Sequence, residues 1–134
     1  MFSWKRPANL GVRDGRLAPP KRTPNCVSSQ ADPADAGHFI APIPFNGASD
    51  EAMQAARRAV QAMERSTIVD EQKNYLYAEF RSRLLGYVDD LELLFDEAAG
   101  LFHVRSASRL GRRDFGVNRS RVERLRKLLQ PTVS

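Results

Sequence analysis

Three consecutive segments between residues 74 and 108, namely 74–82, 86–96 and 101–108, alternate between apolar and polar side chains. Successive side chains of a β-strand point to opposite faces of the sheet, so this alternation predicts strands with one buried face. The connection 97–100 is short and ends on Gly100, where a hairpin turn favours positive φ. We therefore expect antiparallel neighbours, and no other feature constrains the fold as strongly.

Two amphipathic segments predict helices before and after these strands. Residues 49–64 carry an alanine-rich apolar stripe at three- and four-residue spacing, and Ser49 is the expected N-cap. Residues 118–130 carry a second stripe, with Asn118 as the expected N-cap.

The remaining segments are short or irregular. Residues 66–70 favour a short strand, and 38–45 predict an edge strand, because its two prolines cannot donate to a ladder. Residues 1–37 contain several prolines and glycines without periodicity, which predicts an extended arm or wrapping loop.

Together these elements predict the α+β class. We expect a two-layer sandwich: an antiparallel meander sheet of about four to five strands, with two helices and an extended N-terminal arm. The 134 residues suit a single domain. The predicted organisation is an arm over 1–37 and an α+β domain over 38–130.

Composition narrows the classes of protein to consider. No apolar run is long enough to span a bilayer, and no secretory signal follows the N-terminus, so we expect a cytoplasmic protein. One cysteine and two separated histidines do not form a metal signature, and no motif indicates a cofactor. The sequence carries no signal for the oligomeric state.

Charge is distributed unevenly along the chain. Residues 1–22 carry six basic and one acidic side chain, 32–97 carry six and thirteen, and 103–127 carry nine and two. One interpretation is that the basic ends lie over an acidic sheet, and the other is an anion or nucleic-acid surface. Nucleic acid ranks last, because no interleaved aromatic pattern supports base stacking.

The polar side of the predicted hairpin has two interpretations. The face would combine acidic and basic groups, either as a solvated ladder of paired charges or as a binding face with fixed arginine donors. Its members would be Glu79, Arg81, Glu92, His103 and Arg105, together with Asp89 or Asp90.

The stretch from the returning strand into the last helix is the candidate ligand site. It resembles a phosphate-binding loop in position, but Val117 and Asn118 stand where a P-loop has Lys and Ser or Thr, so we reject a nucleotide P-loop. Arginines near a helix N-terminus still favour a carboxylate or phosphate, although they would equally suit a structural network with the acidic strands. The candidate ligand-binding residues are Arg105, Ser106, Ser108, Arg109, Asp114, Asn118 and Arg119.

Catalysis has weaker support. Cys26 needs a nearby histidine to act as a nucleophile and is otherwise a small buried side chain. Asp89 with His103 is the other candidate pair.

Five stretches of this chain resemble the domain of unknown function family 1499 (DUF1499), in the same order and over most of the domain. They are RPANLGVRDGRLAPP (6–20), TPNCVSSQ (23–30), HFIAPIPF (38–45), YVDDLEL (87–93) and HVRSASRLGRRDFGVNRSRVE (103–123).

The resemblance implies that the Cys26 loop and the Arg105–Arg119 stretch form one feature. A second cysteine often precedes the first in this family, but Pro19 and Pro20 stand there in this chain, so no Cys–Cys redox or metal pair is available. No activity follows from the family.

The leading functional hypothesis is therefore a non-catalytic module that binds a small anionic ligand or an acidic protein segment. The alternative is an enzyme, either a hydrolase or a thiol-dependent one, that uses Cys26 or Asp89 with His103.

Overall fold

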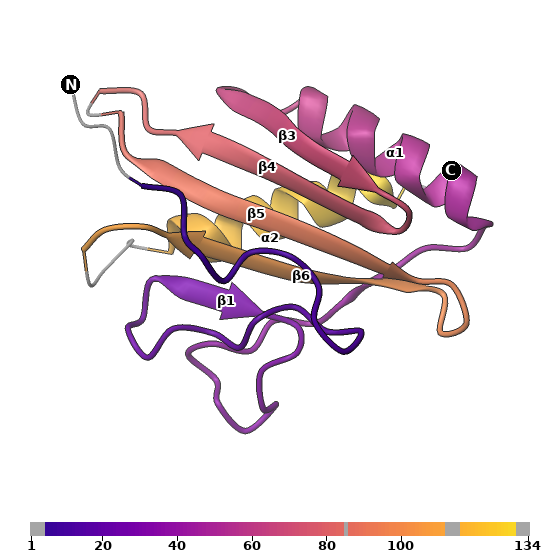
Figure 1. Cartoon of the computed structure of the whole chain (residues 1–134), viewed down its shortest axis with the longest axis horizontal. Helices are drawn as coiled ribbons and strands as arrows, with labels where there is room; N and C mark the ends of the chain where they lie inside the picture. The colour runs from indigo at the N-terminus through magenta and orange to yellow at the C-terminus, as the bar shows by residue number, and fades with distance from the viewer. Residues whose placement is uncertain (1–4, 85, 112–115, 131–134) are drawn as a thin grey trace.

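The computed structural model describes residues 5–84, 86–111 and 116–130. Within them it contains two helices and one antiparallel sheet whose strands differ in length (Figure 1). The strands lie in the order β1-β6-β5-β4-β3, and β2 pairs with the far end of β6. The elements are β1 (Cys26–Ser28), β2 (Ile43–Pro44), α1 (Ser49–Gln61), β3 (Ser66–Gln72), β4 (Tyr75–Arg81), β5 (Val88–Asp96), β6 (Leu101–Ser108) and α2 (Val117–Leu129).

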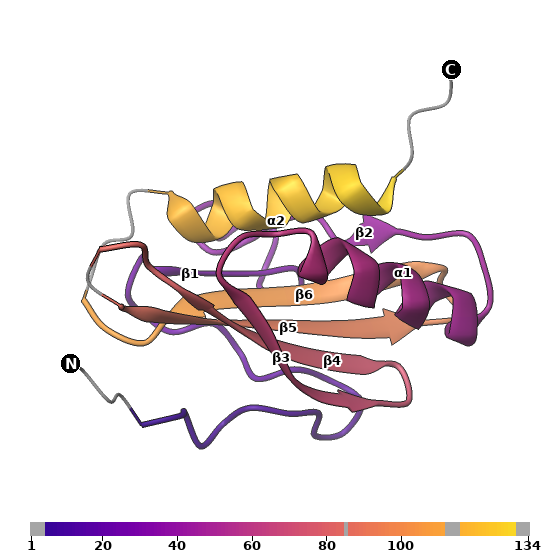
Figure 2. The same cartoon turned by 90° about the horizontal axis from the view of Figure 1, so that it is seen from above.

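Both helices cover one face of the sheet, and the N-terminal arm, residues 5–22, crosses the other (Figure 2). The predicted α+β class is confirmed, with six strands rather than four to five. No helix of the described residues is long and apolar enough to cross a membrane.

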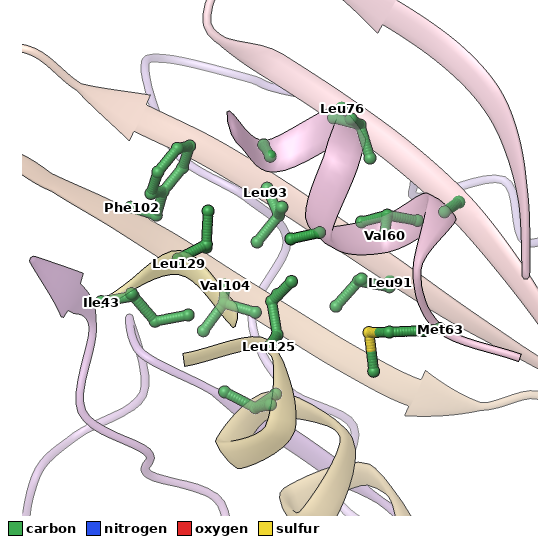
Figure 3. Packing of buried hydrophobic residues seen from close by; sticks show 14 of the residues in the cluster. Ile43, Val60, Met63, Leu76, Leu91, Leu93, Phe102, Val104, Leu125 and Leu129 are labelled. Carbon is green, nitrogen blue, oxygen red and sulfur yellow. The ribbon is translucent and has the colours of Figure 1, made fainter. Parts of the chain in front are cut away.

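The main core lies between the helices and the sheet (Figure 3). Alternate residues of the three long strands point toward the helices, as the sequence pattern predicts, and Leu91, Leu93 and Phe102 are fully buried there. Val60 of α1 and Leu125 of α2 pack onto them and are also fully buried. The small residues of the α1 stripe, among them Ala52 and Ala56, have no exposed surface, which allows α1 to approach the sheet closely.

Helix α1 is shorter at its end than the predicted 49–64, and its cap is Ala48 rather than Ser49. The Ser66 hydroxyl donates to the carbonyls of Val60 and Met63, which satisfies the last turn and directs the chain into β3. The Ser49 hydroxyl donates to Glu97 instead of capping the helix.

Helix α2 begins at Val117, one residue earlier than predicted, and its N-cap is Gly116 at φ 79° rather than Asn118. A left-handed backbone at this position favours glycine. Asn118 therefore lies inside the first turn, where its side chain is available for other contacts.

Strand β1 lies inside the segment that the sequence predicts to be an arm. Its three residues are too few to show an alternating pattern, yet all are buried and pair with β6. Only the preceding part of that segment, residues 5–22, crosses the sheet as an arm (Figure 2).

Two leucines on α2 provide a test of the core. Leu125 is fully buried and Leu128 is 41% exposed. Leu125→Ala should lower the free energy of unfolding by about 2–5 kcal/mol, because it leaves a cavity between α2 and the sheet. Leu128→Ala should change it by less than about 0.5 kcal/mol. Urea unfolding measures both, and equal costs would contradict this packing.

Candidate functional site

The sheet face opposite the helices is polar, and the strand register aligns its side chains in rows. Tyr77, Glu92 and Arg105 stand opposite one another on β4, β5 and β6. Glu79 and Asp90 form the neighbouring row. The predicted sharing of one face is confirmed for these residues, and Asp90 rather than Asp89 belongs to it.

This polar face is buried, so its ladder of paired charges is not solvated. Glu79, Asp90, Glu92 and Arg105 are only 6%, 2%, 0% and 3% exposed. The N-terminal arm covers them, so the charges lie between two layers of polypeptide (Figure 2). A charge removed from water is costly unless it is paired and hydrogen-bonded, so the contacts of each group decide whether the arrangement is stable.

The arm is held by hydrogen bonds along its length. Arg6 Nε donates to Glu79 Oε2 at 2.8 Å, and the Gly11 N–H donates to Glu92 Oε2 at 2.7 Å. Lys21 Nζ donates to the Ser108 carbonyl at 2.7 Å. Leu17 packs against Tyr75 and Tyr77, which adds an apolar anchor. A basic N-terminal segment thus lies over acidic strands, as one interpretation of the charge distribution predicts.

Arg109 is at the centre of the first charge cluster. Its guanidinium donates to both oxygens of Asp90 at 2.9 Å, to Glu79 Oε2 at 2.6 Å and to the Tyr77 hydroxyl at 3.1 Å. The hydrogen bond to Asp90 is the main cause that raises the pKa of Arg109. Burial acts to raise the pKa of Glu79, but hydrogen bonds from Arg6, Tyr77 and Arg109 together lower it to about 2. Arg109 therefore serves a structural network.

Glu92 and Arg105 form a second, looser cluster. Glu92 Oε2 accepts hydrogen bonds from Tyr75 and Gly11, whereas Oε1 is buried without a hydrogen-bond partner among the described residues. The closest ion-pair distance, from Arg105 Nη1 to Glu92 Oε1, is 3.7 Å. Burial raises the pKa of Glu92. The other contact that the Arg105 side chain makes with the described residues, from Nε to the Pro19 carbonyl, is long at 3.4 Å. Arg105 is thus buried with weak partners, unlike Arg109.

A hollow of about 330 Å³ lies between the arm and the end of β6, next to this second cluster. Lys5 and Lys21 border it from the arm, and Arg105 and Arg109 from the sheet side. One carboxylate, Asp90, also borders the hollow, and Arg109 already binds it. The remaining lining residues are Pro7, Asn9, Ala107 and Ser108.

The sheet separates the predicted ligand-binding residues into two groups. Arg105 and Arg109 border the hollow on the arm side. The side chains of Ser106, Ser108 and Asn118 lie on the helix side, where they bond to one another, and Arg119 Nη2 donates to the Ala36 carbonyl at 3.2 Å. The predicted convergence of three arginines on the start of α2 is therefore not found. Asp114 lies outside the described residues.

Asn118 joins three segments. Its Nδ2 donates to the Asn25 carbonyl at 3.1 Å and to Ser108 Oγ at 2.8 Å, and its Oδ1 accepts from Ser106 Oγ at 2.6 Å. Asn25 Nδ2 in turn donates to the carbonyls of residues 110 and 111. The Cys26 strand and the stretch from Arg105 to Arg119 are one hydrogen-bonded feature, as the family resemblance implies, and the feature is structural.

The candidate catalytic groups lie apart. Asp89 points to the helix side, where Arg121 pairs with it at 2.9 Å, while His103 lies on the arm side with Nδ1 3.2 Å from Ser29 Oγ. Asp89 pairs with Ser108, five residues along β6 from His103, which corresponds to roughly 17 Å. Cys26 pairs with Ala107, roughly 13 Å along the same strand from His103. Neither Cys26 nor Asp89 therefore lies within hydrogen-bond reach of His103.

Lys5 and Lys21 are the lining residues that sequence reasoning missed. An arm without periodicity does not reveal which strand it will cross, because its docking depends on tertiary contacts. Two features of the arm could have predicted that it docks on the sheet, namely its excess of basic residues and its isolated leucines. They complement the acidic residues of the sheet and the tyrosines between them.

Comparison with known proteins gives one match. The sequence model of the family described as Protein of unknown function (DUF1499) matches residues 16–129, which include every strand and both helices. No curated protein and no solved structure matches the chain.

The Glu79 network predicts an acid-dependent loss of stability. The folded-state pKa of about 2 lies below the usual 4.5, so the unfolded state binds more protons between these values. The stabilisation is complete above about pH 5 and falls by about 3 kcal/mol as the pH drops toward 2. Glu79→Gln should be less stable at neutral pH and lose this part of the pH dependence in urea unfolding. Glu64→Gln, at an 81% exposed side chain, should keep the wild-type profile.

The Asn118 junction predicts a large cost from a small change. Asn118→Ala should lower the free energy of unfolding by about 2–4 kcal/mol, because it leaves several buried polar groups without partners. Ser120→Ala, at an exposed position in the same helix turn, should cost less than about 0.5 kcal/mol. Chemical denaturation measures both, and a near-neutral Asn118→Ala would show that the junction is dispensable.

Proposed function

The chain belongs to the DUF1499 family, whose function is unknown, and we propose that it is a non-catalytic module that binds a small anionic ligand in the hollow between its N-terminal arm and β6. The observation that carries this proposal is Arg105. Its side chain is 3% exposed and borders the hollow, and its contacts with the other described residues are long, at 3.4 and 3.7 Å. Guanidinium N–H groups in such a position are well suited to a carboxylate or a phosphoryl group.

The surrounding charges support an anion. Lys5, Lys21 and Arg109 border the same hollow, and Asp90, the carboxylate that borders it among the described residues, is neutralised by Arg109. The local excess of positive charge is therefore carried by Lys5 and Lys21, and Arg105 is held only loosely by Glu92 at 3.7 Å. Because the arm shields Arg105 from water, its attraction for an anion exceeds that of the same charge on an open surface.

The size of the hollow favours a small ligand over a protein segment. A volume of about 330 Å³ is near the lower limit for small-molecule sites, which range from roughly 300 to 1,000 Å³. An acidic peptide would need an open groove, and the arm closes much of the face. The position also differs from the sequence-based hypothesis, since it lies on the arm side of β6 rather than at the start of α2.

Binding is the function that these groups support, and catalysis lacks a matching arrangement. The three groups considered for chemistry, Cys26, Asp89 and His103, do not come within reach of one another. None of them borders the hollow.

The proposal predicts stabilisation by small anions that depends on Arg105. Inorganic phosphate, acetate and succinate at constant ionic strength should be compared in thermal unfolding and in calorimetric titration. At least one of them should raise the Tm of the wild-type protein in a saturable way. Arg105→Gln should abolish that shift, because the neutral amide cannot replace the charged donors.

Two further variants separate ligand binding from folding. Lys5→Ala/Lys21→Ala should fold and bind on the order of tenfold more weakly, since both lysines lie in the arm. Arg119→Gln, across the sheet, should bind like wild type. An absence of saturable stabilisation by all three anions would refute the proposal. Loss of binding in Arg119→Gln but not in Arg105→Gln would place the site at α2 instead.

A further inference from the structure

One end of the molecule displays most of the large apolar side chains that remain exposed. Leu84, Tyr87, Leu110 and Val117 are 90%, 43%, 38% and 47% exposed, and they are four of the seven exposed large apolar residues that the structure describes. Leu84 and Tyr87 lie between β4 and β5, Leu110 follows β6, and Val117 begins α2. We call these four residues the apolar end.

The register brings Tyr87 and Leu110 together. The pairing of β5 with β6 continues beyond its last ladder pair, because the Arg109 N–H donates to the Val88 carbonyl at 3.3 Å. Tyr87, just before β5, and Leu110, just after β6, are the next pair of residues along these two neighbouring segments. Both views show the end of β4, the end of β6 and the start of α2 at the same end of the sheet, on the left (Figures 1 and 2).

Basic side chains surround the apolar end. Arg81 and Arg83 are exposed immediately before Leu84. Arg65 and Arg124 border a hollow of about 420 Å³ together with Val117 and Glu64, which pairs with Arg65 at 3.0 Å. Lys5 lies at the adjoining start of the arm, beside Ser108 and Arg109.

The opposite end of the molecule carries charges of both signs. The β5–β6 turn carries Asp96 and Glu97, and Glu97 binds Ser49 at the start of α1. Lys73 is exposed in the adjacent β3–β4 turn, and Arg126 lies in the last turn of α2. The attraction to a negatively charged surface therefore comes from the basic residues around the apolar end itself.

We propose that the apolar end docks on the surface of a membrane that contains anionic phospholipids. Leu84 and its apolar neighbours enter the boundary between headgroups and acyl chains, and the flanking arginines bind lipid phosphates. Nothing enters the bilayer beyond these connections. This inference is independent of the anion site beneath the arm.

The distribution of the residues favours a lipid surface over a protein partner. The apolar side chains belong to chain connections at a narrow end of the sheet, and arginines interrupt them. A stable protein interface buries about 800 Å² on each partner around a continuous apolar centre. A fluid lipid surface needs no matching shape, and a few separate apolar side chains with nearby cations are enough to bind it.

Vesicle cosedimentation of the full chain tests the proposal. Vesicles of phosphatidylcholine with 30 mol% phosphatidylglycerol are compared with pure phosphatidylcholine, in 0.1 M and 0.5 M NaCl. The protein should bind the anionic vesicles, and on the order of tenfold more weakly at the higher salt concentration. Binding to pure phosphatidylcholine should be weaker by a similar factor.

Variants identify the surface. Leu84→Ser and Arg81→Gln/Arg83→Gln should each weaken binding by on the order of tenfold or more. Leu128→Ser, at a 41% exposed position near the other end of α2, should bind like wild type. Leu84 is so exposed that its replacement leaves the fold unchanged, which circular dichroism and the Tm verify.

Three results would overturn the proposal. The first is no binding to anionic vesicles at either salt concentration. The second is equal loss of binding in Leu84→Ser and Leu128→Ser. The third is concentration-dependent self-association, observed by sedimentation velocity and removed by Leu84→Ser, without vesicle binding, which would assign the apolar end to a second copy of the chain.

Discussion

The structure depends on the neutralisation of a charged sheet face that has no access to bulk water. Arg109 bonds to Asp90, Glu79 and Tyr77 at once, so the two carboxylates can stay ionised in a buried position. Without that guanidinium, two neighbouring carboxylates would repel each other and the arm could not cover them. The arm adds Arg6 to the same cluster and closes it. One arginine therefore allows the sheet to have a second buried face.

The two charge clusters on this face differ in how completely they are satisfied. Around Arg109, every carboxylate contact is close to 3 Å or shorter. Around Arg105, the closest carboxylate oxygen is 3.7 Å away and Glu92 Oε1 has no hydrogen-bond partner among the described residues. The groups of the first cluster satisfy one another, whereas those of the second can still form hydrogen bonds with a ligand. The adjoining hollow lies beside the second, which is why we place the ligand there.

The stretch from Arg105 to Arg119 has a structural role and a proposed functional role, because successive side chains of β6 point to opposite faces of the sheet. Arg105 faces the arm and the hollow, whereas Ser106 faces α2 and Asn118. Asn118 fastens α2 to β1 through the Asn25 carbonyl, which holds the edge of the sheet beside Arg105. The family match extends over this whole feature but begins at residue 16, so it omits Lys5 and the start of the arm. The part of β6 that borders the hollow therefore lies within the residues that the family model matches, whereas Lys5 on the arm lies outside them.

The strand pattern, the α+β class and the set of side chains that share the polar face follow from the amino-acid sequence alone. These follow from a local period of two residues that survives in any packing, and the register of β4, β5 and β6 preserves it. Tertiary structure alone decided that the polar face is buried, because burial depends on an arm that is about 70 residues or more from Glu79 and Glu92 in sequence. It likewise placed Arg105 and Arg119 on opposite sides of the sheet. Two residues that are close in sequence need not lie on the same face of the sheet when one is in a strand and the other in the following helix. The path of the chain between the strand and the helix decides where each side chain points.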